Sequence, residues 1–125
     1  MIFDTDIIIW IQRGNQKAAE LVDSDHERCI SILSYMELLQ NAHNKQQQIV
    51  IGNYIKEMDF TVLPLSENIG HRALIYVEEY SLSNGISADD ALIAATAIEN
   101  NQVLVSGNVK HYKPVHELHF KRFQI

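Results

Sequence analysis

The pattern of hydrophobic and polar residues changes along this chain. Short apolar runs typical of strands alternate with longer stretches that have the 3.6-residue spacing of helices. Short runs rich in β-branched and other apolar residues predict five strands, at residues 1–4, 28–33, 60–65, 102–106 and 118–125. The last of these we expect at the edge of the sheet. Strands that alternate with helices predict an α/β fold, a three-layer sandwich whose mostly parallel central sheet is flanked by helices.

The stretches between the predicted strands have helical spacing. They predict six helices, at residues 6–13, 15–24, 34–44, 45–58, 66–83 and 87–100. Asn84-Gly85 and Asn100-Asn101 supply helix-ending signals. In the last helix, apolar residues occupy too much of the circumference for a surface helix, so we expect it to be buried. Its first turn nevertheless carries Asp90, and a buried carboxylate is costly unless something neutralises it.

Composition narrows the class of protein. The 125 residues predict one domain over residues 1–125, and 46% hydrophobic with 21% charged residues is ordinary for a globular protein. No apolar run approaches the roughly 18 residues that a bilayer span needs, and no basic segment precedes the run at residues 7–11. The single cysteine, Cys29, allows no internal disulfide. We therefore expect a cytoplasmic protein without a signal peptide or a membrane segment.

Charge is unevenly distributed along the chain. The net charge of −6 argues against a protein that binds nucleic acid by bulk attraction alone. Residues 101–125, however, carry four of the ten basic residues and only one of the sixteen acidic ones. Their basic residues, Lys110, Lys113, Lys121 and Arg122, either contact substrate phosphates or form a solvated edge of the sheet. Charge alone leaves both interpretations open.

Polar residues follow successive predicted strands. Asp4 closes the first strand, Glu37 lies in the first turn of the helix after the second, and Asn108 follows the fourth. Because the carboxyl ends of parallel strands meet at one edge, these groups converge, and Asp90 joins them if its helix begins there. Carboxylates so close repel one another, and a hard divalent cation such as Mg²⁺ or Mn²⁺ is the usual remedy.

Each acid also has a purely structural interpretation. Ser34-x-x-Glu37 and Ser87-x-x-Asp90 both match the capping box, and acids in a first turn suit the helix dipole. Asp4 taken alone is a common turn residue. The argument for chemistry is the complete set, with one acid at each strand–helix junction beside apolar core. The set predicts a metal site but does not specify a reaction.

Four segments carry a resemblance to a known family. They are FDTDIII at residues 3–9, SILSYMELLQNA at 31–42, NGISADDALIAATAIENN at 84–101 and LVSGNVKHY at 104–112. In this order they resemble the motifs of the PIN-domain family, and most closely those of its VapC-type toxin ribonucleases. The resemblance covers nearly the whole chain.

The resemblance implies roles for individual residues. It places the metal-binding acids on Asp4, Glu37 and Asp90, because Asp90 directly precedes the Ala-Leu-Ile of the motif. At the fourth position many members have an aspartate, whereas here Asn108 and His111 hold the candidate positions, with Asn108 as the fourth catalytic residue. Tyr112 replaces the usual phenylalanine. The implied activity is Mg²⁺- or Mn²⁺-dependent hydrolysis of RNA phosphodiester bonds. The toxin branch further implies a cognate antitoxin protein and a homodimer.

Competing functions remain to be weighed. A receiver-type signalling domain would use Asp59 as phosphoacceptor, but Asp59 precedes its strand, whereas a phosphoacceptor should follow one. A small phosphatase would use Asp4 and Asp6, but the Gly-Thr that should follow and room for a cap domain are both missing. A catalytically silent PIN-like module that binds RNA or protein stays open because Asn108 is neutral. Trp10 belongs either to the core or to an interface.

Overall fold

The computed structural model describes residues 1–125 and contains one five-stranded sheet in the order β3-β2-β1-β4-β5. The strands are β1 (Ile2–Phe3), β2 (Cys29–Ser31), β3 (Thr61–Leu63), β4 (Leu104–Ser106) and β5 (Phe120–Arg122). Every neighbouring pair is parallel, so the expectation of a mostly parallel sheet is confirmed, with β5 at one edge.

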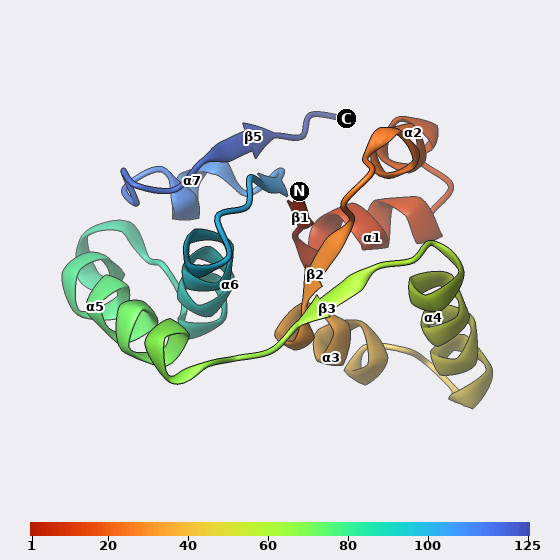
Figure 1. Ribbon diagram of the computed structural model, residues 1–125, viewed down its shortest axis with the longest axis horizontal. Coiled ribbons are helices and arrows are strands. Elements are labelled where there is room, and N and C mark those ends of the chain that lie inside the picture. Colours follow the sequence, from red (N-terminus) through yellow and green to blue (C-terminus); the bar gives the residue numbers. More distant parts are fainter.

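Helices cover both faces of this sheet (Figure 1). They are α1 (Thr5–Gln12), α2 (Gln16–Ser24), α3 (Ile32–Gln40), α4 (Lys45–Glu57), α5 (Glu67–Asn84), α6 (Ala88–Glu99) and α7 (Val109–Tyr112). Ile2 and Leu104 pack with α5 and α6, whereas the next residues along each strand, Phe3 and Val105, pack with α1 and α2. This alternation follows from the two-residue period of a strand, and it produces the predicted three-layer sandwich.

The order of strands reverses between β1 and β4. From β1 the chain proceeds outward through β2 and β3 on one side, and β4 and β5 later occupy the other side. Such a switch point opens a crevice at the carboxyl ends of the two central strands. The backbone N–H of Asp4 donates to the carbonyl of Val105 at 3.0 Å, which keeps the ends of β1 and β4 together.

Helix α6 is buried as its composition predicts, with Ala91, Ile93, Ala94, Ala95, Thr96 and Ala97 all inside the protein. The Ser87 hydroxyl caps it by accepting a hydrogen bond from the Asp90 backbone N–H at 3.1 Å. Gly85 ends α5 in the left-handed region at φ 82°, where glycine is favoured. Both helix signals of this region are therefore confirmed.

The predicted junction after β2 is wrong. The strand ends at Ser31 rather than at residue 33, and Ser31 is the cap of α3, with its hydroxyl accepting from the Leu33 N–H at 3.2 Å. Ser34 lies inside the helix and its buried hydroxyl has no partner. Glu37 consequently lies in the second turn of α3 and belongs to no capping box. A serine that directly follows the strand caps the helix before a later one can do so.

Sequence periodicity did not predict the short helix α7, which follows β4.

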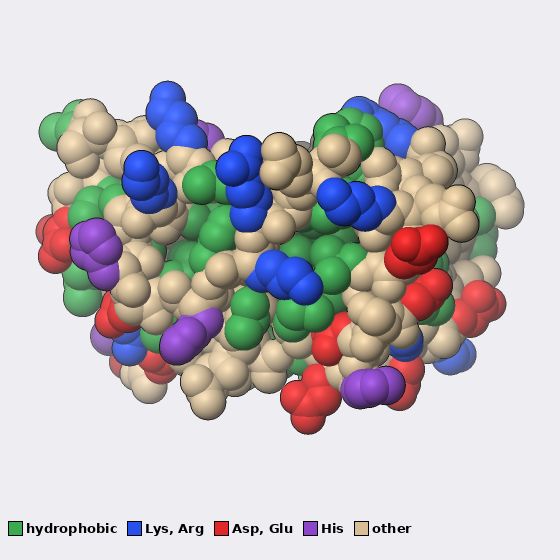
Figure 2. All heavy atoms as spheres, turned by 90° about the horizontal axis from the view of Figure 1, so that it is seen from above, with side chains coloured by type: hydrophobic (Ala, Val, Ile, Leu, Met, Phe, Trp, Pro, Cys, Tyr) green, Lys and Arg blue, Asp and Glu red, His purple; other side chains and the backbone are tan.

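Basic side chains gather on the face that carries β5 and α2, with acidic ones toward its margins (Figure 2). No helix combines the length and the apolar character that crossing a membrane would require.

Candidate functional site

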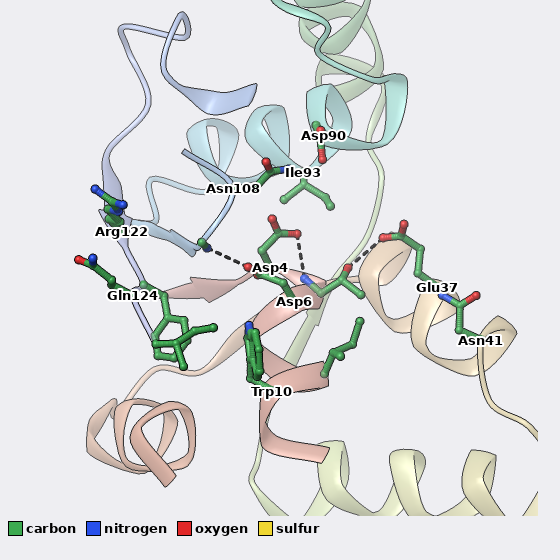
Figure 3. Close-up of a pocket in the computed structure, with 15 residues that line it drawn as sticks. Asp4, Asp6, Trp10, Glu37, Asn41, Asp90, Ile93, Asn108, Arg122 and Gln124 are labelled. Atoms are coloured by element: carbon green, nitrogen blue, oxygen red, sulfur yellow. Dashed lines mark hydrogen bonds between the residues drawn. The ribbon is translucent and has the colours of Figure 1, made fainter. Parts of the chain in front are cut away.

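A pocket of about 680 Å³ lies at the carboxyl ends of the central strands (Figure 3). Its wall contains all four predicted site residues, Asp4, Glu37, Asp90 and Asn108. Asp4 comes directly after β1, Glu37 from α3, Asp90 from the start of α6, and Asn108 from the turn after β4. The structure therefore brings together side chains that are far apart in the sequence, as the convergence of strand ends predicts.

Asp4 is the most deeply buried acid of the pocket, with 6% of its surface exposed. One carboxylate oxygen caps α1 by accepting from the Thr5 N–H at 2.8 Å. The other accepts from the Ser106 hydroxyl at 2.7 Å and the Tyr112 hydroxyl at 2.9 Å. Burial, together with the negative charge of Asp6, raises the pKa of Asp4 to about 6. The side chain is thus fixed in position while its charge is only partly compensated.

Asp90 meets two side chains of the α7 segment. Its Oδ2 lies 2.8 Å from His111 Nδ1, and the Tyr112 hydroxyl lies 3.3 Å from its Oδ1. His111 Nδ1 is also 2.9 Å from the Asn108 amide nitrogen. A ring nitrogen offers either one proton or one lone pair, and donation to the carboxylate is the stronger, charge-assisted choice. Asn108 and His111, the two candidates for the missing fourth acid, therefore contact each other, and His111 in turn contacts Asp90.

The Tyr112 hydroxyl lies between the carboxylates of Asp4 and Asp90. Only 2% of Tyr112 is exposed, and burial, together with the charges of Asp4 and Asp90, raises the pKa of its hydroxyl far above the usual range. The hydroxyl therefore stays protonated and donates. This contact joins two of the three predicted metal-binding acids through a side chain that sequence analysis noted only as a departure from the family.

Glu37 has a different environment. It is half-buried, and its Oε1 accepts a hydrogen bond from the Thr5 hydroxyl at 2.9 Å. Burial raises the pKa of Glu37, and the nearby charges of Asp89 and Asp90 act in the same direction. The Thr5 side chain is therefore the only hydrogen-bonded connection between Glu37 and the Asp4 side of the pocket.

Asp6 is a fifth acidic or amide side chain in the pocket wall. Its Oδ2 accepts from the Gly107 N–H at 2.8 Å, whereas its buried Oδ1 has no hydrogen-bond partner. A Cβ at Gly107 would lie 3.0 Å from Asp6 Oδ2, so this close approach needs a glycine. Burial raises the pKa of Asp6. An unpartnered buried carboxylate oxygen beside Asp4 indicates negative charge that the protein alone does not compensate.

The donor groups of the pocket bear on the predicted divalent ion. As the side chains lie, no three His, Cys, Asp or Glu groups are close enough to hold a metal ion together. The pocket nevertheless presents carboxylate and amide oxygens, which are the ligands that Mg²⁺ and Mn²⁺ prefer. The unpartnered Asp6 Oδ1 and the raised pKa of Asp4 both indicate a place for positive charge. The chemistry of these oxygen-bearing side chains fits a hard cation.

The structure separates the four basic residues of the C-terminal region. Arg122 lines the pocket, whereas Lys110, Lys113 and Lys121 do not. Trp10 also lines it and is partly buried against the cluster around Phe3. Sequence analysis missed the pocket roles of Thr5, Ser106 and Tyr112. Only the Thr5 contact had a local signal, namely a hydroxyl between two aspartates at the start of a helix.

Comparisons with known proteins agree with this arrangement. Residues 1–115 match the PIN domain family. Ribonuclease VapC1 of Rickettsia felis is 31% identical, over 94% of this chain and 92% of that protein. A toxin–antitoxin complex from Klebsiella pneumoniae contains a similar fold, with a TM-score of 0.83 and 23% identity over 99% of this chain and 98% of that chain. The structure of VapBC2 from Rickettsia felis bound to a DNA fragment from its promoter also contains a similar fold. Its TM-score is 0.77, with 22% identity over 99% of this chain and 100% of that chain. The predicted resemblance is confirmed, and the chain belongs to the PIN-domain family, among its VapC-type members.

Proposed function

We propose that this protein is a metal-dependent ribonuclease and the toxin of a type II toxin–antitoxin pair. The observation that carries the proposal is the convergence of Asp4, Glu37 and Asp90 in one pocket at the switch point of the sheet. Similarity to a protein named as a VapC ribonuclease supports RNA as the substrate. Similarity of fold to toxin–antitoxin complexes supports an antitoxin as the partner.

Asp4, Glu37 and Asp90 would hold Mg²⁺ or Mn²⁺, and Asn108 would complete the site through its amide oxygen or by positioning a water. A bound ion of this kind activates a water for attack on phosphorus and stabilises the charge that develops on the phosphate. The chain's own contribution is orientation. Ser106 and Tyr112 fix Asp4 through hydrogen bonds of 2.7 and 2.9 Å, and His111 fixes Asp90 at 2.8 Å. Such outer contacts strengthen and aim the ligands that they touch.

The proposal extends to the state of the protein in the cell. We propose that residues 1–125 act as one cytoplasmic domain that forms a homodimer. Exposed apolar side chains on α5 support self-association, because Leu74, Ile75 and Leu82 share one side of the helix, with Glu78 among them, and are 58%, 50% and 101% exposed.

Cleavage of bulk cellular RNA by antitoxin-free protein tests the proposal. Wild-type protein should cut with Mg²⁺ or Mn²⁺ and fail with EDTA, and Asp90→Asn should abolish cutting. Asp59→Asn is the matched control, because Asp59 is an exposed aspartate outside the pocket and its φ of 55° suits asparagine. Cutting that survives Asp90→Asn would contradict the proposed site.

A catalytically silent PIN-like module is the second candidate function. The observation in its favour is that the fourth position is the neutral Asn108, in contact with His111 rather than free in the pocket. Folded wild-type protein that binds RNA but cuts none with either metal would support the silent module. If the wild-type protein takes up phosphate from a small phosphodonor and Asp59→Asn does not, the result would instead support a receiver-type signalling domain.

A further inference from the structure

The pocket extends well beyond the acids. In Figure 3, Glu37 and Asn41 lie on one side of Asp4 and Asp6, while Arg122 and Gln124 lie on the other. The volume of about 680 Å³ falls in the range of pockets that enclose a small-molecule ligand, and it exceeds what an ion and one phosphate need. The side opposite Glu37 is therefore available for more of the substrate than the scissile phosphate.

Arg122 is the single cationic side chain among the residues that line this pocket. It is exposed, and it takes part in none of the protein's ion pairs or side-chain hydrogen bonds. Pairing of Ser106 with Arg122 across β4 and β5 holds its backbone level with the serine that binds Asp4. A guanidinium that is fixed at the backbone and free at its tip is suited to bidentate contact with a phosphate.

Trp10 is the only tryptophan of the chain and lines the same pocket, packed against the hydrophobic cluster that contains Phe123, the residue next to Arg122. Its indole nitrogen makes no hydrogen bond within the protein, and in Figure 3 it points toward the carboxylates. The Arg13 guanidinium carbon lies 5.5 Å from the ring centroid. Proteins bind single-stranded RNA by combining an aromatic ring that contacts an unstacked base with a guanidinium that contacts phosphate. Trp10 and Arg122 bring both groups to the wall of one pocket.

We propose that Trp10 and Arg122 form a nucleotide-binding subsite next to the scissile phosphate. Trp10 contacts the base of the neighbouring nucleotide, and Arg122 binds that nucleotide's phosphate. The inference rests on the proposed ribonuclease function and adds to it that the substrate is unpaired at this nucleotide, because a base in a duplex would not reach the ring. Lys110, Lys113 and Lys121, outside the pocket wall, play no part in it.

The fluorescence of Trp10 provides a direct test, because this side chain is the only indole present. Wild-type protein is titrated with a short single-stranded RNA in Ca²⁺, and gel electrophoresis verifies that the oligomer stays intact. The base-bearing oligomer should quench or shift the emission, whereas an abasic oligomer of equal length should not. Equal responses to the two oligomers, or no response from protein that cleaves RNA, would overturn the subsite.

Arg122→Gln tests the phosphate contact, with Lys56→Gln as a control of equal charge change on the exposed end of α4. Loss of the Arg122 contact should weaken RNA binding about tenfold and lower the salt dependence by about one phosphate contact. Equal weakening by both variants would assign the effect to net charge and contradict the subsite. Wild-type protein that neither binds nor cleaves RNA would contradict the ribonuclease proposal itself, which separates the two failures.

Discussion

The two sides of the acid site are built differently. Asp4 and Asp90 are joined by the Tyr112 hydroxyl, at 2.9 and 3.3 Å, and Asp4 is almost completely buried. Glu37, across the pocket on α3, is half-buried and has one contact within the site, with the Thr5 hydroxyl. One side is therefore organised before any ion binds, and the other can still move.

The difference indicates how the site would assemble. The pair Asp4 and Asp90 loses little side-chain freedom when it ligates an ion, because its hydrogen bonds already fix it, whereas Glu37 must be ordered at that moment. Each carboxylate should therefore contribute differently to ion affinity and to protein stability. Substitutions on the two sides separate these contributions.

Asp4→Asn should have a large effect of the same kind as Asp90→Asn, and the largest among the comparisons that follow. RNA cleavage should fall on the order of 1,000-fold, because loss of metal-based stabilisation is worth several kcal/mol. The metal-free variant should melt no lower than wild type, because asparagine also caps helices and removes a buried charge whose pKa is raised to about 6. Cleavage assays and thermal unfolding in EDTA check both parts. A variant that melts well below wild type would show that the Asp4 charge stabilises the fold.

Glu37→Gln should lower cleavage less, by about 10- to 100-fold, with a larger part of the loss in metal affinity. The physical reason is that Glu37 is half-buried and unfixed, so water or Asp6 can replace part of its contribution. Titration of activity against Mn²⁺ concentration measures the loss. Glu57→Gln, at an exposed position of α4, is the matched control and should behave as wild type. An effect as large as that of Asp4→Asn would remove the distinction between the two sides.

Tyr112→Phe restores the residue usual in the family and removes only the hydroxyl between Asp4 and Asp90. Mn²⁺ affinity, measured by calorimetry, should weaken about tenfold, as for other contacts that orient metal ligands. Tyr54→Phe, a half-buried tyrosine of α4, removes a hydroxyl elsewhere and should leave the affinity unchanged. Unchanged affinity in Tyr112→Phe would mean that Ser106 and His111 orient the pair without it.

The sequence predicted those parts of the site that are marked by local sequence signals. The Ser87 cap and the continuous apolar face of residues 91–97 place Asp90 at the entrance of a buried helix, and both are confirmed. The contacts of Asp4 with Ser106 and Tyr112 join residues 102 and 108 positions apart, so no local pattern could indicate them. They depend on β4 pairing with β1 in the register that sets Phe3 opposite Val105.

The prediction that Ser34 caps α3 and that Glu37 lies in its first turn is wrong for a local reason. Ser31 and Ser34 both precede helical residues, and a capping-box match favoured the second. The backbone decides between them, because Ser31 has the extended conformation that a cap requires (φ −65°, ψ 140°) and terminates β2. Glu37 is thereby moved to the second turn, where its partner is a side chain of α1 rather than its own helix.

Thr5→Val should produce the smallest effect and addresses the link between the two sides. Valine keeps the shape of threonine but cannot donate to Glu37, so Glu37 becomes freer while Asp4 keeps its cap from the Thr5 backbone N–H. Metal affinity should fall about two- to fivefold, since a hydrogen bond to the half-buried Glu37 falls in the lower part of the usual range, on the order of 0.5–1 kcal/mol. Thr61→Val, exposed in β3, is the control. If Glu37→Ala is made in the same protein, the Thr5 effect should vanish, because alanine cannot accept the Thr5 hydrogen bond and the hydroxyl acts on the site only through Glu37. Additive losses would instead mean that Thr5 orients Asp4, and that the two sides are one unit.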